Sequence, residues 1–320
     1  MKINLITPAG KQLKNGNWNT AMRWARLLRR TGHQVHVANN YDGRAVDLLI
    51  ALHAWHSAKA VQRYRVHAPK GPLVIGLGGT DVNTFLKSDR QITLSAMKAA
   101  DALICLHDLI GEALPPPLWS RLHVVRQSAT PLSVRRIPSK RHFDVCVIGH
   151  LRDEKDPFRA ALAARQLPNN SSLRVIHLGG ATTAKYAKRA AIEMARNTRY
   201  YWRGEVPGWR VRREFSKTHA MVISSIQEGG ANVVSEALVA GVPVIASNIA
   251  GNIGLLGPDY PGYFPVGDTS ALAKLLHQAE TEPAFLISLA RHVRRLAPLF
   301  SPVREQAALE RIVTKVTRPK

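Results

Sequence analysis

The stretch SSIQEGGANVVSEALVAGVPVIAS, residues 224–247, decides how this chain folds. It begins within an apolar run, residues 220–226, which has the composition of a buried strand. The pair Gly229-Gly230 predicts a turn in which the backbone adopts positive φ or approaches another group closely. A helix is expected from Asn232, as its N-cap, to about Ala240, and a second strand follows it. This order of elements is typical of a parallel α/β sheet.

Two carboxylates flank the glycine turn. Glu228 lies in the loop at the positive end of the expected helix, and Glu236 lies about one turn into it. The start of a helix, with its free N–H groups and a glycine-rich loop before it, binds phosphate. A carboxylate can accept two hydrogen bonds from the two hydroxyls of a sugar diol. A single glutamate in a first helical turn is usually only a partner of the helix dipole. Two of them around GGAN, after a buried strand, favour a nucleotide-sugar site.

A second charged turn follows the strand expected at residues 143–148. It begins at Gly149 and presents Arg152 and Lys155 before the next helix. Two cations three residues apart can hold a diphosphate and offset the charge that builds on a leaving nucleotide. In isolation the same residues would be an ordinary solvated turn. The sequence has no D-x-D motif to hold a divalent metal, so we expect these cations to take the metal's place.

Three loops of the N-terminal half carry further candidates. The loop after the first strand contains Thr7-Pro8-Ala9-Gly10 and then Asn15-Gly16-Asn17, a composition that lets the backbone approach a ligand. His53 follows the third strand, and Thr80-Asp81 follows the fourth, where Asp81 either orients an acceptor or caps a helix. The first loop is not G-x-G-x-x-G, which weakens a dehydrogenase interpretation. G-x-S-x-G, H-E-x-x-H and Walker motifs are also absent from the sequence.

Length and composition favour an ordinary globular chain of two domains. The chain has 320 residues, of which 45% are hydrophobic. No apolar stretch approaches the length of a membrane span, and the N-terminal MKINLITPAG predicts a first strand rather than a signal peptide. Cys105 and Cys146 each lie inside an apolar run, which indicates buried thiols and a cytoplasmic location.

The net charge of +23 is large and raises a nucleic-acid interpretation, because Lys and Arg gain affinity by displacing counterions from phosphate. The basic residues are spread over many patches, however, and no zinc finger, basic zipper or RNA-binding signature is present. Solvated helix faces explain most of the patches. A positive field also attracts small phosphorylated substrates. We therefore expect no nucleic-acid partner and keep nucleic-acid binding as a minority hypothesis.

Strands and helices alternate through both halves of the chain, which predicts an α/β fold with parallel sheets covered on both faces. Residues 130–142 carry proline and charge without an apolar period and are the candidate linker. We expect domains over 1–135 and 136–300, with a helix over 301–320 that packs back on the first domain. A cleft between the two sheets is the expected ligand site. The expected strands are 3–7, 35–38, 48–52, 73–77, 102–106, 124–126, 143–148, 173–178, 200–203, 220–226 and 244–246; the expected helices are 19–30, one from 57, 93–100, 157–166, 182–197, 232–240 and the tail from 283.

These residues resemble a known family. The spacing of Glu228 and Glu236, the turn GHLRDEKDP, the Gly179-Gly180 pair and the stretch YYWRGEVP are similar to metal-independent, retaining-type glycosyltransferases of the GT-B architecture, which has two Rossmann-like domains facing across a cleft. A closer resemblance, over nearly the whole chain, is to the selenosugar synthases of bacterial selenoneine biosynthesis. The segments that carry it are TPAG…NGN, TAMRWARLLRRTGHQV, LLIALHAWHSA, GLGGTDV, VIGHLRDEKDPFRAALAARQLP, EGGANVVSEALVAGVPVIAS and NIGLLGPDYPGYFPVGDTSALA.

The resemblance implies a reaction and a set of site residues. That subgroup joins selenophosphate to a UDP-sugar, typically UDP-N-acetylglucosamine, forms a carbon–selenium bond, releases UDP, and hands the selenosugar to a selenoneine-forming enzyme. By motif, Arg152, Lys155 and Glu228 would be the catalytic residues, Glu236 would hold the ribose, and no metal or other cofactor would be needed. The other implied donor-site residues are Gly149, Arg203, Gly204, Gly229, Gly230, Ala231, Asn232 and Val233, and the implied acceptor-side residues are Gly16, Asn17, His53, Thr80 and Asp81.

Two other functions stay open at this point. The first is a GT-B glycosyltransferase with a hydroxyl acceptor on a small metabolite or lipid, for which a base near the cleft is expected and Asp81 is the candidate. The second is a basic nucleic-acid-binding protein. Selenophosphate is already a soft nucleophilic anion that needs positioning and charge compensation more than deprotonation, so a basic cleft suits it.

Overall fold

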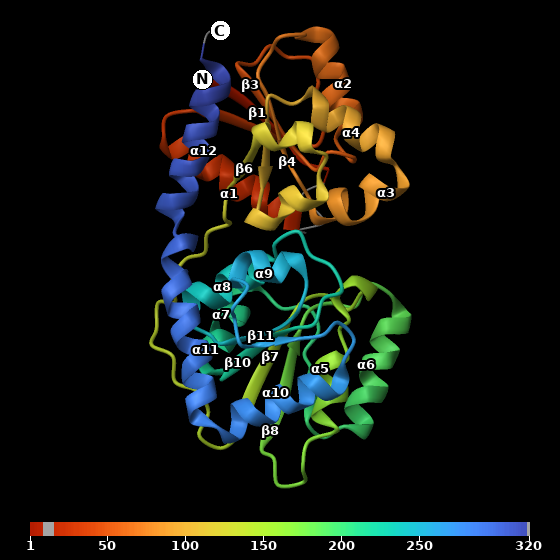
Figure 1. Ribbon diagram of the computed structural model, residues 1–320, viewed down its shortest axis with the longest axis vertical. Coiled ribbons are helices and arrows are strands. Elements are labelled where there is room, and N and C mark those ends of the chain that lie inside the picture. Colours follow the sequence, from red (N-terminus) through yellow and green to blue (C-terminus); the bar gives the residue numbers. More distant parts are fainter. Residues whose placement is uncertain (9–15, 319–320) are drawn as a thin grey trace. The chain divides into compact units, whose positions relative to one another are not determined.

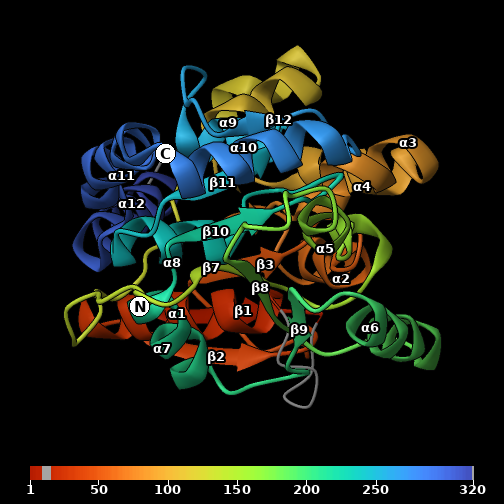
Figure 2. The ribbon, with the colours of Figure 1, turned by 90° about the horizontal axis from the view of Figure 1, so that it is seen from below.

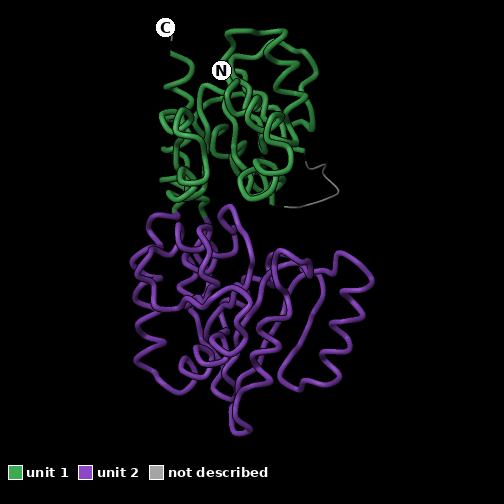
Figure 3. The backbone as a smooth tube through the Cα atoms, turned by 45° about the vertical axis from the view of Figure 1, so that its right-hand side comes forward, with its two compact units in different colours: residues 1–128, 301–320 green, residues 129–300 purple. Residues whose placement is uncertain are grey.

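The computed structural model describes residues 1–8 and 16–318. The chain forms two compact units, which Figure 3 draws in different colours. Unit 1 consists of residues 1–128 together with 301–320, and unit 2 consists of residues 129–300. Each unit is built around one six-stranded sheet whose paired strands are parallel.

The sheet of unit 1 has the order β2-β1-β3-β4-β5-β6. Strand β3 is LLIAL, a run of apolar residues that are all buried, as expected for an inner strand of a sheet covered on both faces. Figure 1 shows the helices that flank these strands. The strands are β1 (Lys2–Ile6), β2 (Gln34–Ala38), β3 (Leu48–Leu52), β4 (Leu73–Gly76), β5 (Ala102–Cys105) and β6 (Leu122–Val124); the helices are α1 (Gly16–Arg30), α2 (Ala58–His67), η1 (Asp81–Phe85), α3 (Leu86–Ser88), α4 (Arg90–Ala99), η2 (Asp108–Ala113), η3 (Pro116–Arg121) and α12 (Pro302–Thr317).

Helix α12 completes unit 1 from the far end of the sequence. Its residues Leu309 and Ile312 share one hydrophobic cluster with Trp24 of α1 and with strands β1 and β3. Glu305 of α12 is 1% exposed. Its carboxylate accepts hydrogen bonds from Arg23 Nε at 3.0 Å, Trp24 Nε1 at 2.9 Å and the Ser128 N–H at 2.8 Å. A buried acid with several donors is therefore the polar anchor of α12.

The sheet of unit 2 has the order β12-β11-β10-β7-β8-β9. Figure 2 shows this sheet with helices on both of its faces. The strands are β7 (Phe143–Ile148), β8 (Leu173–Leu178), β9 (Tyr200–Trp202), β10 (Ala220–Ile223), β11 (Val244–Ser247) and β12 (Tyr263–Phe264); the helices are η4 (Asp153–Lys155), α5 (Arg159–Ala164), α6 (Ala184–Arg196), α7 (Gly208–Lys217), α8 (Asn232–Ala240), α9 (Ala250–Leu256), α10 (Thr269–Thr281), α11 (Pro283–Leu296) and η5 (Ala297–Phe300).

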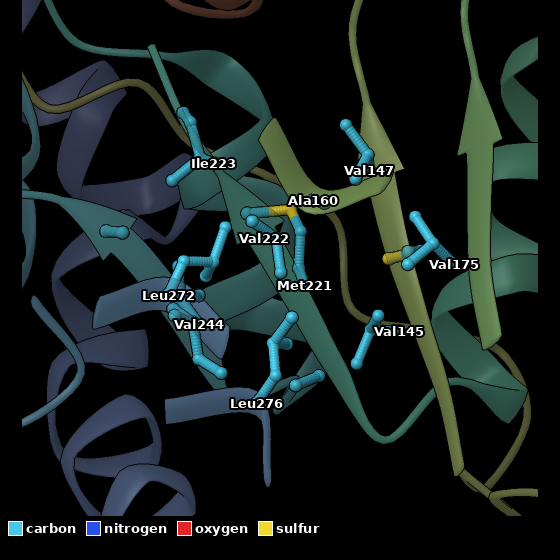
Figure 4. Close-up of a cluster of buried hydrophobic side chains, with 14 of the residues drawn as sticks. Val145, Val147, Ala160, Val175, Met221, Val222, Ile223, Val244, Leu272 and Leu276 are labelled. Carbon is cyan, nitrogen blue, oxygen red and sulfur yellow. The ribbon is translucent and has the colours of Figure 1, made fainter. Parts of the chain in front are cut away.

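The core of unit 2 lies under the central strands. Figure 4 shows valine, isoleucine and methionine side chains of β7, β8, β10 and β11 packing with leucines of α10. Val145, Val222 and Val244 are at most 1% exposed, as is Leu276 of the covering helix. Close packing of this kind holds the loops at the strand ends in fixed positions.

The predicted fold class, two Rossmann-like α/β units with parallel sheets, is confirmed by these two sheets. Several element bounds differ from the sequence expectations. Helix α1 begins at Gly16 rather than Asn19, and β10 ends at Ile223 rather than at residue 226. Beyond Ile223 the backbone leaves the ladder, and the N–H of Ile226 donates to the carbonyl of Glu154 at 2.9 Å instead of to a neighbouring strand. Helices α7, α9 and α10 were not expected from the sequence.

Candidate active site

A small hollow opens at the carboxyl edge of the unit 2 sheet, where β7 and β10 lie side by side. Strands β8 and β9 extend the sheet from β7 in one direction, and β10 and β11 extend it in the other. The chain thus reverses its strand order between β7 and β10, which is where open α/β sheets bind ligands. The residues that line the hollow are Val147, Ile148, Gly149, His150, Lys155, Pro157, His177, Val222, Ile223, Ser224 and Ser225.

Two of the three catalytic candidates, Lys155 and Glu228, form an ion pair. Nζ of Lys155, at the end of η4, contacts Oε1 of Glu228, in the loop after β10. The hydroxyl of Ser225 donates to the same carboxylate oxygen at 2.6 Å. The side chains of Lys155 and Glu228 are 20% and 11% exposed, so their charges lie largely out of solvent. The structure therefore joins two residues that the sequence suggested as separate ligand contacts, and it adds Ser225, which the sequence analysis missed.

Hydrogen bonds to main-chain carbonyls fix the distance between these two loops. The N–H of Ile226 donates to the carbonyl of Glu154 at 2.9 Å, and the Ser224 hydroxyl donates to Asp156 O at 2.9 Å. Asp156 ends the turn in the left-handed region, with φ of 41°. An aspartate tolerates that region better than most residues because its short side chain bonds locally. The position of Lys155 against Glu228 is thus set by the main chain.

Two glycines allow backbones to meet at this edge of the sheet. A Cβ on Gly251, in α9, would lie 2.4 Å from the carbonyl oxygen of Glu228, and a Cβ on Gly179 would lie 1.9 Å from that of Gly149. Gly179 also has a φ of 154°, in the range that favours glycine. Only residues without a Cβ fit at these two positions. Gly179 belongs to a pair that the sequence analysis noted, whereas Gly251 went unnoticed because nothing local marks it.

The buried side chain of His177 is hydrogen-bonded to the backbone of the Gly149 turn. It is 1% exposed, with Nε2 at 3.0 Å from Gly149 O and Nδ1 at 3.0 Å from the Tyr200 hydroxyl. Burial lowers the pKa of His177 to about 4, so the ring is neutral at pH 7. Nε2–H then donates to the carbonyl of Gly149, and Nδ1 accepts from Tyr200. No local sequence pattern selects this histidine.

The glycine turn and α8 follow Glu228 directly. Gly230 has a φ of 115°, Ala231 is buried, and Asn232 is the first residue of α8. The expected N-cap role of Asn232 is wrong, because Ala231 holds the extended capping position. Gly229 and Val233 are half-buried on either side of this junction. Glu236, one turn into α8, has an exposed side chain, so it is accessible to a ligand.

Arg152 and Arg203 are the exposed cations of this edge. The Arg152 guanidinium lies 3.7 Å from the Glu154 carboxylate, with the side chain 48% exposed, a loose contact that leaves it open to other anions. Arg203 follows β9, and its guanidinium lies 5.6 Å from the Tyr201 ring centroid. The carbonyl of Gly204 accepts from the Gly179 N–H at 2.8 Å, which links the ends of β9 and β8.

The acceptor-side candidates all lie in unit 1. His53 and Thr80 meet at the ends of β3 and β4, where His53 Nε2 lies 2.7 Å from Thr80 Oγ1. Asp81 is fully buried, and its carboxylate accepts hydrogen bonds from the N–H groups of Ala54, Trp55 and Gly78. Gly16 and Asn17 form the first turn of α1 rather than a loop, because the helix starts earlier than its apolar pattern indicated. Residues Ala9 to Asn15 of the predicted glycine- and asparagine-rich loop lie outside the described residues.

Residues 1–8 and 16–318 hold no group of three or more His, Cys, Asp or Glu side chains that would serve as metal ligands. None of the helices in these ranges combines the length and the apolar character that crossing a bilayer requires.

Comparison with known proteins places this arrangement in a family. The model of glycosyl transferases group 1 matches residues 134–296, just over half of the chain and nearly all of unit 2. The chain therefore belongs to the group 1 glycosyltransferases. It is 21% identical over 306 residues to glycosyltransferase 1 domain-containing protein 1 of Xenopus tropicalis, with 88% of each protein covered.

Solved structures with the same fold cover almost the whole chain. The protein Alr3699/HepE of Anabaena, solved in complex with UDP, is similar with a TM-score of 0.79 at 16% identity, over 98% of this chain and 100% of that one. Sucrose-phosphate synthase of Thermosynechococcus elongatus is similar with a TM-score of 0.80 at 16% identity, over 98% of each chain. These similarities show that the fold is that of GT-B glycosyltransferases.

Proposed function

We propose that this protein transfers a sugar from a UDP-sugar, and that residues at the carboxyl edge of the unit 2 sheet hold the donor. The observation that carries the proposal is the Lys155–Glu228 ion pair at the strand-order reversal, next to the N-terminus of α8. Anabaena HepE, which has the same fold, was solved in complex with UDP-glucose. Family, fold and site chemistry thus agree on a nucleotide-sugar donor.

The ion pair has a chemical use in such a reaction. An ammonium group has three donors, so Lys155 can keep its bond to Glu228 and still donate to a phosphate oxygen. As the bond between the anomeric carbon and UDP breaks, negative charge grows on the diphosphate. Lys155, Arg152 and the N–H groups at the start of α8 offset this charge, and Glu236 binds the ribose hydroxyls. Glu228 orients Lys155 toward the phosphates.

The acceptor that we propose is selenophosphate, and the donor that we propose is UDP-N-acetylglucosamine. The product is then a selenosugar with a new carbon–selenium bond, made in the cytoplasm without a metal ion and passed to a selenoneine-forming enzyme. This part of the proposal is supported by the sequence resemblance over segments such as GGANVVSEAL and LLGPDYPGYFPVGD. The net charge of +23 favours a small anionic acceptor.

One incubation series tests the proposal. The purified protein is mixed with selenophosphate and, separately, with UDP-N-acetylglucosamine, UDP-glucose and UDP-galactose, with and without EDTA, and the products are identified by mass spectrometry. We expect a selenosugar and free UDP in equal amounts, with the same yield in EDTA. UDP release from none of these donors would refute the transfer reaction, and UDP release without a selenium-containing product would refute the acceptor.

A second candidate is a transferase with a hydroxyl acceptor. The observation that favours it is the contact between His53 Nδ1 and the buried Asp81 carboxylate, at 2.8 Å, since a hydroxyl acceptor has a proton to lose. In the same incubations, a panel of polyols and glycerol lipids replaces selenophosphate. Faster UDP release with a hydroxyl compound than with selenophosphate would establish this alternative.

A further inference from the structure

One main-chain N–H group at the carboxyl end of β7 is unpaired. The Gly149 N–H donates to Leu178 O and the Leu151 N–H donates to Gly180 O, both at 2.9 Å, so these two groups point toward β8. The His150 N–H lies between them and has no hydrogen-bond partner in the described part of the chain. A backbone N–H is an obligatory donor, so this one is available to a ligand or to water.

This N–H group points toward the hollow between β7 and β10. Consecutive residues of an extended strand direct their N–H and C=O groups to opposite sides. The carbonyl of Asp144, an even number of residues before His150, accepts from the His219 N–H next to β10, so this set of residues faces β10. Strand β10 ends at Ile223, which Figure 4 labels, and supplies no partner beyond it. The space there is the hollow, which Lys155 also lines.

The buried side chain of His177 fixes the other half of this peptide. The N–H of His150 and the C=O of Gly149 belong to one planar trans peptide, so they point in opposite directions. His177 Nε2 lies 3.0 Å from Gly149 O, and a carbonyl only accepts, so Nε2 carries the proton. The Tyr200 hydroxyl, 3.0 Å from Nδ1, donates to that nitrogen and holds the ring in this orientation. The bond from His177 thus sets the direction of the His150 N–H.

Close packing also prevents this peptide from rotating. A Cβ on Gly179 would lie 1.9 Å from Gly149 O and 2.4 Å from its carbonyl carbon, so the peptide packs directly on the backbone after β8. His177 and Tyr200 are 1% and 2% exposed, and Tyr200 belongs to the hydrophobic cluster of unit 2. Buried polar side chains are costly unless they are hydrogen-bonded. The hydrogen bonds of this pair lead to the peptide between Gly149 and His150.

We propose that the His150 N–H donates to the diphosphate of the UDP-sugar, and that His177 is the positioning residue that aims it. The inference rests on the proposed sugar transfer and deepens it. When the bond between the anomeric carbon and the diphosphate breaks, its electron pair leaves with UDP and negative charge grows on the phosphate oxygens. A donor that is already held in place stabilises this charge without rearrangement. The N–H adds a neutral, fixed contact to the cationic contact from Lys155.

The amide signal of His150 in the wild-type protein is the first test. The full chain is labelled with nitrogen-15 in histidine only, and the amide signal that is missing in His150→Gln is assigned to His150. Addition of UDP should move the His150 amide proton downfield, because the donor gains a charged acceptor. Uridine has the base and the ribose but no phosphate, and it should leave the signal in place. A His150 amide that does not respond to bound UDP, or that responds equally to uridine, would overturn the inference.

A matched pair of substitutions at position 177 tests the positioning role. Glutamine places its amide nitrogen near the position of Nε2 and can still donate to Gly149 O, whereas asparagine is one carbon shorter and does not reach it. We expect His177→Gln to bind UDP within about threefold of the wild type and His177→Asn to bind it about tenfold more weakly. Both variants should bind uridine as the wild type does, which a general disruption of unit 2 would not permit. Equal UDP affinity of wild type and folded His177→Asn, in calorimetric titration, would refute the role of His177.

Turnover gives a readout that is separate from stability. With a UDP-sugar, His177→Asn should lower kcat by a larger factor than it raises the KM, because the charge on the diphosphate is greatest in the transition state. His177→Gln should recover most of the wild-type kcat. A raised KM with an unchanged kcat in His177→Asn would contradict a contribution to the transition state.

The failure of this inference is distinct from failure of the proposed function. If the wild type neither binds UDP nor releases it from any UDP-sugar, the proposed function fails and the inference fails with it. If the wild type transfers a sugar but its His150 amide does not respond to UDP, only the inference is overturned. The NMR measurement on the wild type needs no substitution at His177, so it remains decisive if His177→Asn does not fold.

Discussion

In the proposed reaction, the donor chemistry depends on Lys155 and Glu228, and the structure shows these two residues paired with each other. Each is the other's ion-pair partner in a site from which most solvent is excluded. A lone charge in such a place is costly, and a pair that is already assembled needs no rearrangement when charge develops on a leaving group. The pair thus serves both folding and the proposed reaction.

Replacement of Lys155 by Met should lower the turnover of UDP-sugar by about a hundredfold, because one donor to the diphosphate is lost. The fold should survive, since Glu228 keeps its bond from Ser225. Steady-state kinetics with circular dichroism as a fold check make the measurement. Lys185→Met, at an exposed lysine of α6, is the control. Near-wild-type turnover in folded Lys155→Met would remove this residue from the mechanism.

Glu236→Ala should weaken UDP binding by about tenfold, the scale of one charge-assisted hydrogen bond to the ribose, and should leave stability almost unchanged because the side chain is exposed. Calorimetric titration with UDP measures the effect. Glu282→Ala, at an exposed glutamate before α11, is the control. An unchanged affinity for UDP would contradict the role of Glu236.

Buried histidines give the protein a pH-dependent stability. Burial lowers the pKa of His177 in unit 2 and of His107 in unit 1 from 6.5 to about 4. Between pH 4 and 6.5 the unfolded chain binds more protons than the folded chain. The contribution of these two rings to the free energy of unfolding is therefore fully present above pH 6.5 and is lost as the pH falls toward 4. Each histidine accounts for up to about 3 kcal/mol over that window.

Urea unfolding at pH 7.5 and 4.5 should therefore show a marked fall in the free energy of unfolding. His107→Phe should reduce the fall, because in the described structure both ring nitrogens of His107 are buried without partners. Equal stability of the wild type at the two pH values would show that these rings are not buried as described.

At the level of elements, close backbone approach holds the loops after β7, β8 and β10 together, in addition to the Lys155–Glu228 ion pair. Gly179 contacts the Gly149 carbonyl, and Gly251 of α9 contacts that of Glu228. Such contacts leave no freedom for a methyl group. The geometry of the site is thus a property of how strand ends and helix starts pack.

Gly179→Ala should destabilise unit 2 by about 1–3 kcal/mol or more. The new methyl group would overlap Gly149 O, and the positive φ of residue 179 disfavours alanine. The matched control is Gly208→Ala at the start of α7, where a Cβ meets open space. The control should be neutral or slightly stabilising. Thermal unfolding compares the two, and equal melting temperatures would contradict the close approach.

Sequence patterns predicted the elements that have strong local signals. The alternation of buried strands with helices indicated two parallel sheets, and the spacing around GGAN selected Glu228 near a helix start. Ser225, Gly251 and His177 were missed because their roles arise from contacts with residues distant in the sequence. Asp81 was expected to be a cap or an acceptor contact, and its four donors come from two separate loops that no local pattern connects. Short helices such as α9 were missed because seven residues carry too little periodicity.

For the whole molecule, the two units differ in whether one continuous stretch of sequence forms them. Unit 2 is continuous, whereas unit 1 needs α12 from the far end of the chain. Glu305 is the buried anchor of that return. Loss of one partner from a buried ionic group leaves the other charge without compensation.

Glu305→Ala should destabilise unit 1 by about 3–5 kcal/mol, because Arg23 and Trp24 lose their acceptor inside the protein. Glu310→Ala, on the same helix with a carboxylate that is 28% exposed, should cost about 1 kcal/mol or less. Chemical unfolding is measured with and without UDP, whose proposed site lies in unit 2. UDP should still raise the free energy of unfolding of Glu305→Ala. If it no longer does, the substitution has disturbed unit 2 as well as unit 1.

The discontinuous origin of unit 1 has a consequence for biogenesis. A ribosome releases residues 129–300 as one uninterrupted block, which can fold as soon as it emerges. Residues 1–128 are synthesised earlier. Their apolar side chains that pack against α12 stay uncovered until residues 302–317 have been translated. We therefore expect unit 2 to complete its fold before unit 1, although unit 1 contains the start of the chain.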